Sequence, residues 1–241
     1  MKFTVKSEKP GKVKAGCVVL GVFEKRTLSD AAGEFDKTTR GLLTQLLKDG
    51  EMDGKSGQTL LVHYPRGAHC ERVLLVGCGK KKEFSEKRYR DAVAAAAGVV
   101  NSSGASDATS YLAELDVADR DLYWKVRQMV EVSIATLYSP DELKSKKARK
   151  TRQLRRLAIN AADADTTHRA IRDGGAIAGG VELARRLGNL PGNICTPSYL
   201  ADQARELGKA HSKLKVSVLD ESDMEKLGMG SLLSVSRGSR E

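Results

Sequence analysis

The stretch RVLLVGCG, residues 72–79, decides the expected fold class. Apart from Arg72 it is apolar throughout, without the alternation of polar and apolar side chains that marks a strand facing water on one side. A short and continuously apolar strand is typical of a sheet that other elements cover on both faces. We therefore expect an α/β protein in which helices pack on both sides of a sheet.

Strand-like and helix-like segments alternate on either side of this stretch. The other predicted strands cover 17–23, 59–64, 109–115 and 155–160. The predicted helices between them cover 29–48, 85–104 and 119–138. Ser29 can cap the first helix and Gly104 can end the second, because serine and glycine are favoured at these positions. The alternation predicts a mixed sheet with helices on both faces.

A long helix that contains four glycines is predicted at 166–189. Thr167 can cap it, and its apolar side chains fall on one stripe. Each glycine costs about 1 kcal/mol relative to alanine inside a helix; the four are Gly174, Gly175, Gly179 and Gly180. Such a helix needs tertiary support, so we interpret it as a packed connector between two domains. The alternative is a helix that is broken at Gly174–Gly175.

A second α/β unit is predicted after the connector. Its elements are a helix at 198–213, a strand at 214–220, a short helix at 222–228 and a strand at 231–239. Two strands and two helices cannot bury a sheet on both faces. This unit therefore either packs against the first domain or belongs to a chain that is cut short.

The connection LGNLPGNICTPSYLADQA, residues 187–204, is rich in rigid and turn-forming residues. Asn189 suits the end of a helix, and Pro191 prevents the helix from continuing. Thr196 can accept a hydrogen bond from a free N–H group of the next helix, with Pro197 at the first helical position. We therefore expect a defined turn between two helices here.

The composition is that of a globular protein with a basic charge balance. Of the 241 residues, 40% are hydrophobic and 30% are charged, which is enough for a packed core. The net charge of +10 raises the chance of a polyanionic partner without bearing on the fold. The start, MKFTVKSEKPGKVK, lacks the apolar stretch of a secretory signal, and the longest apolar run, 92–100, is too short to span a membrane. With four cysteines and no such signal, we expect reduced thiols, a cytoplasmic location and no membrane partner.

The sequence Gly77-Cys78-Gly79 after a strand invites a nucleotide-binding interpretation. The dinucleotide fingerprint needs a third glycine, but Lys80–Lys82 replace the glycine region, and the next helix starts only near Ser85. A phosphate-binding loop would need Gly-Lys-Ser/Thr with the correct upstream glycine spacing, and that arrangement is also absent. We interpret the stretch as a plain loop between a strand and a helix.

Four residues of metal-ligating types lie close together in the sequence: His63, His69, Cys70 and Cys78. The adjacent pair His69–Cys70 has awkward geometry for one ion, and Cys78 ends a different strand. We interpret Cys78 as a small buried apolar side chain, and His168 and His211 as surface residues. The sequence contains neither a Gly-x-Ser-x-Gly elbow nor a His-Glu-x-x-His motif.

The segment DELKSKKARKTRQLRR, residues 141–156, carries eight basic residues in sixteen positions. Nucleic-acid phosphates can neutralise such a run. The plainer interpretation is a solvated surface loop, which charge runs usually are. Because aromatic residues and a known reading motif are absent from it, the plainer interpretation is favoured, and DNA binding through 144–156 is the alternative.

The C-terminal third carries motifs of a known family. The pattern Asn189-x-Pro191-x-Asn193-x-x-Thr196-Pro197-x-x-Leu200-Ala201 is followed by Leu227-Gly228-Met229-Gly230 and then Gly238-Ser239. With the glycine-bearing helix before it, this order resembles the leucyl (cytosol) aminopeptidases over roughly residues 166–241. Residues 1–160 are similar to the variable N-terminal domain of that family in length and in the order of elements, without a sharp motif.

The resemblance implies a macro-like N-terminal α/β domain at 1–163, a linker helix at 164–189 and the start of a metallopeptidase catalytic domain at 190–241. It also implies a hexamer that removes N-terminal residues from peptides with two divalent cations, Mn or Zn. In the family, the lysine and carboxylates that hold these cations follow the residues corresponding to Gly238–Ser239. No catalytic, cofactor-binding or metal-ligating residue is therefore assigned within 1–241, and no cation is expected on this chain.

Three functions are open at this point. The first is the N-terminal part of a leucyl aminopeptidase, inactive by itself because the metal-binding half is absent. The second is a DNA-binding accessory protein that uses the basic segment 144–156. The third is an assembly module that joins full-length subunits.

Overall fold

The computed structural model describes residues 1–140 and 153–239. The chain divides into two compact units, unit 1 (Met1–Glu182) and unit 2 (Leu183–Glu241). Unit 1 contains the sheet and the helices that cover it, which confirms the predicted α/β class. The long helix α5 (Ala164–Asn189) begins in unit 1 and ends in unit 2.

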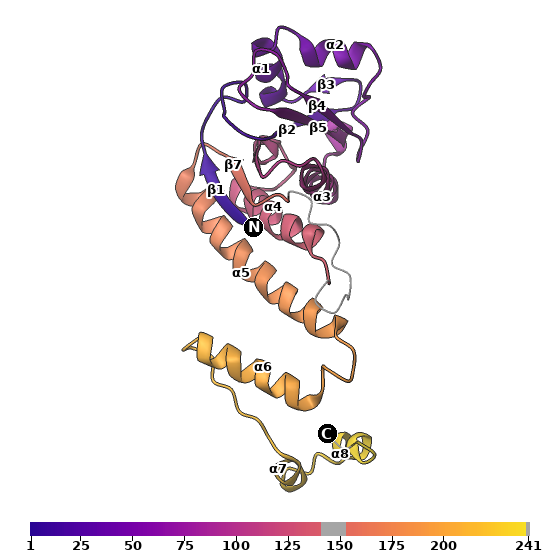
Figure 1. Ribbon diagram of the computed structural model, residues 1–241, viewed down its shortest axis with the longest axis vertical. Coiled ribbons are helices and arrows are strands. Elements are labelled where there is room, and N and C mark those ends of the chain that lie inside the picture. The colour runs from indigo at the N-terminus through magenta and orange to yellow at the C-terminus, as the bar shows by residue number, and fades with distance from the viewer. Residues whose placement is uncertain (141–152, 240–241) are drawn as a thin grey trace. The chain divides into compact units, whose positions relative to one another are not determined.

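Unit 1 is built on a mixed sheet of seven strands (Figure 1). The strands are β1 (Lys2–Lys6), β2 (Val18–Phe23), β3 (Thr27–Leu28), β4 (Thr59–His63), β5 (Arg72–Gly79), β6 (Asp107–Ser110) and β7 (Arg156–Asn160). Their order is β1-β7-β6-β2-β5-β4, with β3 paired to β2. Strands β1, β7, β6, β2 and β5 are parallel, whereas β4 and β3 run antiparallel to β5 and β2. The strands predicted at 17–23, 59–64, 72–79 and 155–160 are confirmed.

Helices cover both faces of this sheet, as predicted (Figure 1). The helices of unit 1 before α5 are α1 (Asp30–Thr38), α2 (Leu42–Lys48), α3 (Glu86–Ser102) and α4 (Leu122–Leu137), with two 3₁₀ turns, η1 (Lys81–Glu83) and η2 (Leu112–Glu114). The helices α1 and α2 share one apolar core with one face of β2 and β5. The helices α3 and α4 share a second core with the opposite face.

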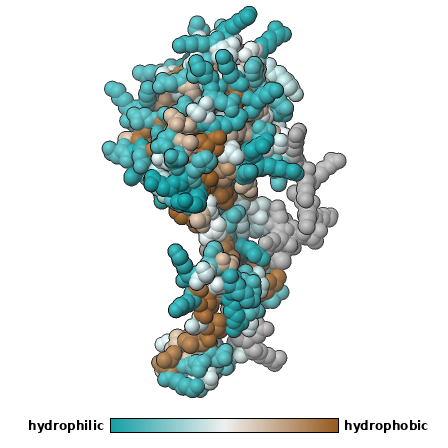
Figure 2. All heavy atoms as spheres, turned by 90° about the vertical axis from the view of Figure 1, so that its left-hand side faces the viewer, coloured by the Kyte–Doolittle hydropathy of each residue, from teal (hydrophilic) through white to brown (hydrophobic). Residues whose placement is uncertain are grey.

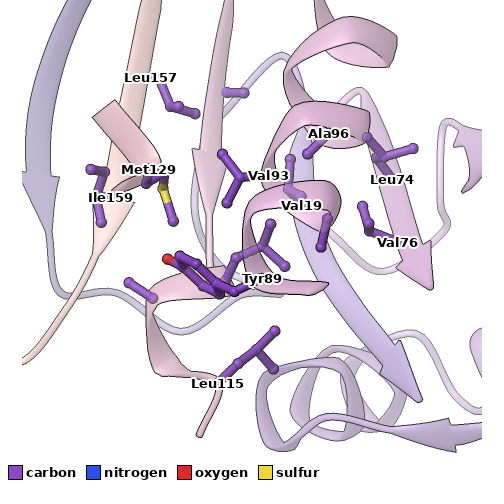
Figure 3. Packing of buried hydrophobic residues seen from close by; sticks show 14 of the residues in the cluster. Val19, Leu74, Val76, Tyr89, Val93, Ala96, Leu115, Met129, Leu157 and Ile159 are labelled. Carbon is purple, nitrogen blue, oxygen red and sulfur yellow. The ribbon is translucent and has the colours of Figure 1, made fainter. Parts of the chain in front are cut away.

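The centre of the sheet is buried on both sides because consecutive side chains of β2 and β5 enter different cores. Val18 and Leu20 belong to the core under α1 and α2, whereas Val19 between them belongs to the core under α3 and α4. Figure 3 shows Val19 close to Val93 and Ala96 of α3. This double burial explains why β5 is apolar along its whole length.

The predicted helix at 29–48 is in fact two helices, α1 and α2. Between them, Arg40 and Gly41 adopt the left-handed backbone conformation, with φ of 56° and 85°. The buried carboxylate of Asp36 accepts a hydrogen bond from the amide of Leu43 at 2.6 Å and so caps the second helix. The apolar period continues across the break, which is why the sequence pattern did not reveal it. Ser29 caps α1 as predicted, because its hydroxyl accepts from the Ala32 amide at 3.3 Å.

Three further details of unit 1 differ from the predictions. The N-terminal strand β1 was not predicted, and the strand expected at 109–115 is the shorter β6, followed by η2. The expected cap of the long helix, Thr167, is wrong because α5 begins three residues earlier. The carboxylate of Asp163 accepts from the Thr166 amide at 3.0 Å instead.

The helix α5 is continuous through its glycines, so the alternative of a break at Gly174–Gly175 is wrong. Gly174 lies against α4, where a Cβ atom would be 3.0 Å from the carbonyl oxygen of Arg127 and 3.1 Å from Cβ of Val130. At the other three glycines, Gly175, Gly179 and Gly180, a Cβ atom would meet nothing within 4 Å. Contacts among the described residues therefore explain one glycine of the four.

Unit 2 consists of helices and their connections over its described residues. They are the end of α5, then α6 (Pro197–Ala210), α7 (Glu221–Lys226) and α8 (Gly230–Ser236). The predicted turn is confirmed: α5 ends at Asn189, and the Thr196 hydroxyl accepts from the Tyr199 amide at 3.3 Å with Pro197 as the first helical residue. Within the described parts of both units, no helix is long and apolar enough to cross a bilayer.

The two strands predicted for unit 2 are wrong. Residues 214–220 have no regular structure, and most of 231–239 belongs to α8. A strand needs a neighbouring strand to satisfy its N–H and C=O groups. The described residues of unit 2 contain no such neighbour, so an apolar pattern alone does not produce a sheet there.

The packing of α5 on α4 can be tested with alanine at adjacent glycines. Gly175→Ala should raise the free energy of unfolding by about 1 kcal/mol, because alanine is the better helix former and the new methyl group meets nothing. Gly174→Ala should lower it by about 1 kcal/mol or more, because the methyl group would press on the Arg127 carbonyl. Urea unfolding followed by circular dichroism measures both. Equal stabilisation by the two changes would contradict the close packing.

Candidate functional site

A small pocket lies at the carboxyl ends of β2, β5 and β6, and we call it the carboxyl-edge crevice. Its volume is about 130 Å³. It is lined by Phe23, Ser29, Asp30, Ala31, Lys81, Tyr111, Glu114, Leu115 and Asp116. The chain leaves β2 toward one face of the sheet and leaves β5 and β6 toward the other. In open α/β sheets, ligands bind at this kind of switch point.

The crevice is acidic although the protein as a whole is basic. Its lining residues include three carboxylates, Asp30, Glu114 and Asp116, and one cation, Lys81. Partial burial raises the pKa of the Glu114 carboxyl, an effect opposed by a 2.7 Å hydrogen bond from the Asn160 amide group. An arrangement of this kind can accept hydrogen bonds from a cationic or donor group.

Partly buried polar contacts hold the crevice in shape. The side-chain oxygen of Asn160, at the end of β7, accepts from the Glu8 amide at 2.9 Å. The Tyr111 hydroxyl donates to the Glu8 carbonyl at 2.8 Å. Sequence reasoning missed Asn160 and Glu114. The available indication was that Asn160 ends a predicted strand, where polar side chains of an α/β sheet gather.

The glycines of Gly77-Cys78-Gly79 serve internal packing. A Cβ atom at Gly77 would lie 1.9 Å from the carbonyl oxygen of Lys55, so the loop before β4 can approach β5 only at a glycine. The Gly77 amide donates to the Gln58 carbonyl at 2.8 Å, and the Gly79 amide donates to the Gly54 carbonyl at 2.9 Å. These two glycine amides therefore donate hydrogen bonds within the protein and are not available to a phosphate.

The structure does not bring the four candidate metal-ligating residues together. His63 and His69 are exposed, whereas Cys70 and Cys78 are buried in different cores on opposite faces of the sheet. Cys78 is a small side chain in an apolar environment, as predicted. His168 and His211 are exposed, as predicted.

The described residues do not fit the two cations implied by the family resemblance. Over 1–140 and 153–239, no three His, Cys, Asp or Glu side chains are grouped so that they could hold a metal ion. The crevice carboxylates form no such group either. No chemical step through a metal can therefore be derived from these side chains.

The basic segment expected at 144–156 falls largely outside the described residues, which stop at 140 and resume at 153. Its described end leads into β7, with Leu154 buried and Arg155 and Arg156 exposed. The proposed DNA contact of this segment stays a prediction.

Comparison with known families gives two adjoining matches. The sequence profile of the cytosol aminopeptidase family, N-terminal domain, matches residues 19–147. The profile of the cytosol aminopeptidase family, catalytic domain, matches residues 182–241.

Curated relatives are similar along the whole chain. A "Probable cytosol aminopeptidase" of Thioalkalivibrio sulfidiphilus is 50% identical, over 100% of this chain and 49% of that protein. A "Probable cytosol aminopeptidase" of Idiomarina loihiensis is 46% identical, over 99% of this chain and 48% of that protein. The chain thus spans about half the length of the curated relatives it matches.

Solved structures share the fold. A mutant tomato leucine aminopeptidase matches with a TM-score of 0.84 at 23% identity, over 100% of this chain and 48% of that chain. The bottromycin maturation enzyme BotP in complex with Mn matches with a TM-score of 0.73 at 25% identity, over 94% of this chain and 43% of that chain. The tomato likeness concerns the fold alone.

The reactivity of the cysteines can test their assignment to the core. Burial raises the pKa of the Cys17 and Cys78 thiols to about 12 and that of Cys70 to about 11. At pH 8 we expect a disulfide reagent such as Ellman's to react quickly with the half-buried Cys195 and to reach the other three only after unfolding in guanidinium.

The matched control is Cys195→Ser, which should abolish the fast phase and leave the slow phase unchanged. Rapid labelling of Cys70 or Cys78 in the folded protein, located by peptide mapping, would contradict their burial.

Proposed function

The chain belongs to the cytosol aminopeptidase family, a family of peptidases, and on this premise we propose that it is the N-terminal part of a metal-dependent leucyl aminopeptidase. The reaction of the whole protein would be the removal of N-terminal amino acids from peptides. The observation that carries the proposal is the pair of adjoining family matches, with the catalytic match confined to 182–241 in a chain half as long as its relatives.

The apolar surface of unit 2 supports the proposal. No residue of α6, α7 or α8 is buried. Figure 2 shows apolar side chains at the surface in the lower part of the view, where unit 2 lies. Its exposed large apolar residues are Leu200, Leu214, Val218, Leu219, Leu227, Met229, Leu232 and Val235. A unit that leaves this much apolar surface in water gains little from burial, so we propose that the remainder of the catalytic domain completes its core.

The metal chemistry would then belong to the remainder of the protein. The two cations of the family, manganese or zinc, would be held by residues outside 1–241. The described residues contain no group that fits a metal, so the 241-residue chain by itself is proposed to be inactive.

The organisation of the whole protein follows from the same premise. We propose a macro-like domain at 1–163, a linker helix at 164–189 and the start of the catalytic domain at 190–241. A hexameric assembly in the cytoplasm, acting on peptides, is part of the proposal and is supported by the family membership alone.

Hydrolysis of leucine amide in the presence of manganese tests this function. The 241-residue chain should release leucine at the background rate, because the residues that would hold the cations are absent from it. A chain that continues to the length of the relatives should release leucine, and a chelator should abolish that release. Circular dichroism should show that both chains are folded. Chelator-sensitive hydrolysis by the 241-residue chain would overturn the proposed location of the metal site.

A further inference from the structure

A second hollow in unit 1, on a different side from the carboxyl-edge crevice, has the composition of an anion site. It lies between the α1–α2 junction and the end of β4, and we call it the Arg40–Arg66 groove. Its volume is about 560 Å³. This falls within the range of roughly 300–1,000 Å³ that is typical of small-molecule sites. Arg40, Arg66 and His63 line it, and none of its lining residues is acidic.

The two arginines of the groove are free to bind an anion. Both are exposed, and among the described residues neither has a carboxylate within ion-pair distance. The nearby carboxylate of Asp36 does not compete, because it is buried and accepts from the amides of Leu43 and Thr44 at 2.6 Å and 3.1 Å. Unpaired guanidinium groups that share one hollow are suited to forked hydrogen bonds with phosphate oxygens.

An aromatic ring lines the same groove as these cations. Tyr64 is 73% exposed, an unusual position for a large ring unless something covers it. Leu42, Val62 and Pro65 add apolar surface to the same hollow. Exposed rings next to arginines are the surfaces on which planar groups of phosphate-bearing ligands stack.

The backbone of the groove departs from ordinary conformations. Arg40 and Tyr64 both have positive φ, 56° and 51°, which is uncommon for residues other than glycine. Among the described residues, five such positions occur, and two of them line this one hollow. Backbone outliers of this kind cluster at binding sites, where the conformation directs a side chain.

We propose that the Arg40–Arg66 groove binds a small phosphate monoester that carries a planar ring, of the size of a nucleoside monophosphate. A phosphate monoester has a charge of about −1.5 to −2 at neutral pH, so it can neutralise two unpaired arginines. A ligand with a single carboxylate would neutralise only one of them. The groove is an open hollow, and its volume and its two arginines suit a small free ligand rather than a long polyanion, which needs an extended basic track. This site is independent of the proposed peptidase function.

Calorimetric titration of the 241-residue chain tests the proposal, with AMP, adenosine and inorganic phosphate as probes. AMP should bind at least about tenfold more tightly than adenosine, because only AMP carries the phosphate charge. Arg40→Asn and Arg66→Gln should each weaken AMP about tenfold. Asparagine is chosen at position 40 because it tolerates a positive φ. Tyr64→Asn should weaken AMP and leave inorganic phosphate unchanged.

The matched control is Arg26→Asn. Arg26 is also an exposed arginine with positive φ, 59°, but it does not line the groove. Its replacement should leave AMP binding unchanged, and thermal unfolding should show that every variant folds. Equal binding of adenosine and AMP, or an equal loss in Arg26→Asn, would overturn the site. Tighter binding of a single-stranded oligonucleotide without a terminal phosphate would assign the groove to nucleic acid and overturn it as well.

Discussion

Burial of β2 and β5 on both faces is the constraint on which the rest of unit 1 depends. Every residue of β2 is buried, and β5 is buried from Val73 onward. Two separate cores result, one under α1 and α2 and the other under α3 and α4. Because helices pack on both sides of these strands, adding or removing one methylene group on either strand should disturb the packing of a helix layer and lower the stability.

The same constraint decides where polar chemistry can lie. The interior of the sheet has no room for charged groups, so the polar side chains gather where strands end and loops begin. The carboxyl-edge crevice lies at the ends of three parallel strands, and the Arg40–Arg66 groove lies where β4 ends beside the break between α1 and α2. The loop before β4 also approaches β5 through its backbone, at Gly77.

The sequence predicted the fold best where burial is greatest. The stretches 17–23 and 72–79 are continuously apolar because they are buried on both faces, so their pattern reports their environment directly. The strand β1 was missed because it is only partly buried and its ends are lysines. The break at Arg40–Gly41 was missed because the helical period continues across it. The strands expected at 214–220 and 231–239 show the converse case, since a strand also requires a partner that the pattern of one segment does not reveal.

The candidate sites were less predictable than the fold because neither depends on a local motif. Glu114 and Asn160 are 46 residues apart in sequence, and their hydrogen bond follows from the pairing of β6 with β7. Arg40 and Arg66 belong to a helix junction and to the turn after an edge strand, which only the folded sheet brings to one hollow. By contrast, the Gly-x-Gly stretch resembles a binding motif in the sequence, but in the folded protein its glycines allow a loop to pack closely on β5.

In helix α5, the helix propensity of the residues and their tertiary packing do not agree at every glycine. Its buried residues, Thr167, Ala170, Gly174 and Ala178, all lie in its first fifteen positions and recur every three or four residues. The one glycine that packing explains, Gly174, belongs to this stripe. Beyond it, Gly179 and Gly180 weaken the helix by about 1 kcal/mol each without a described contact in return. Among the described residues, the buried side chains of α5 therefore lie within the first fifteen positions of the helix.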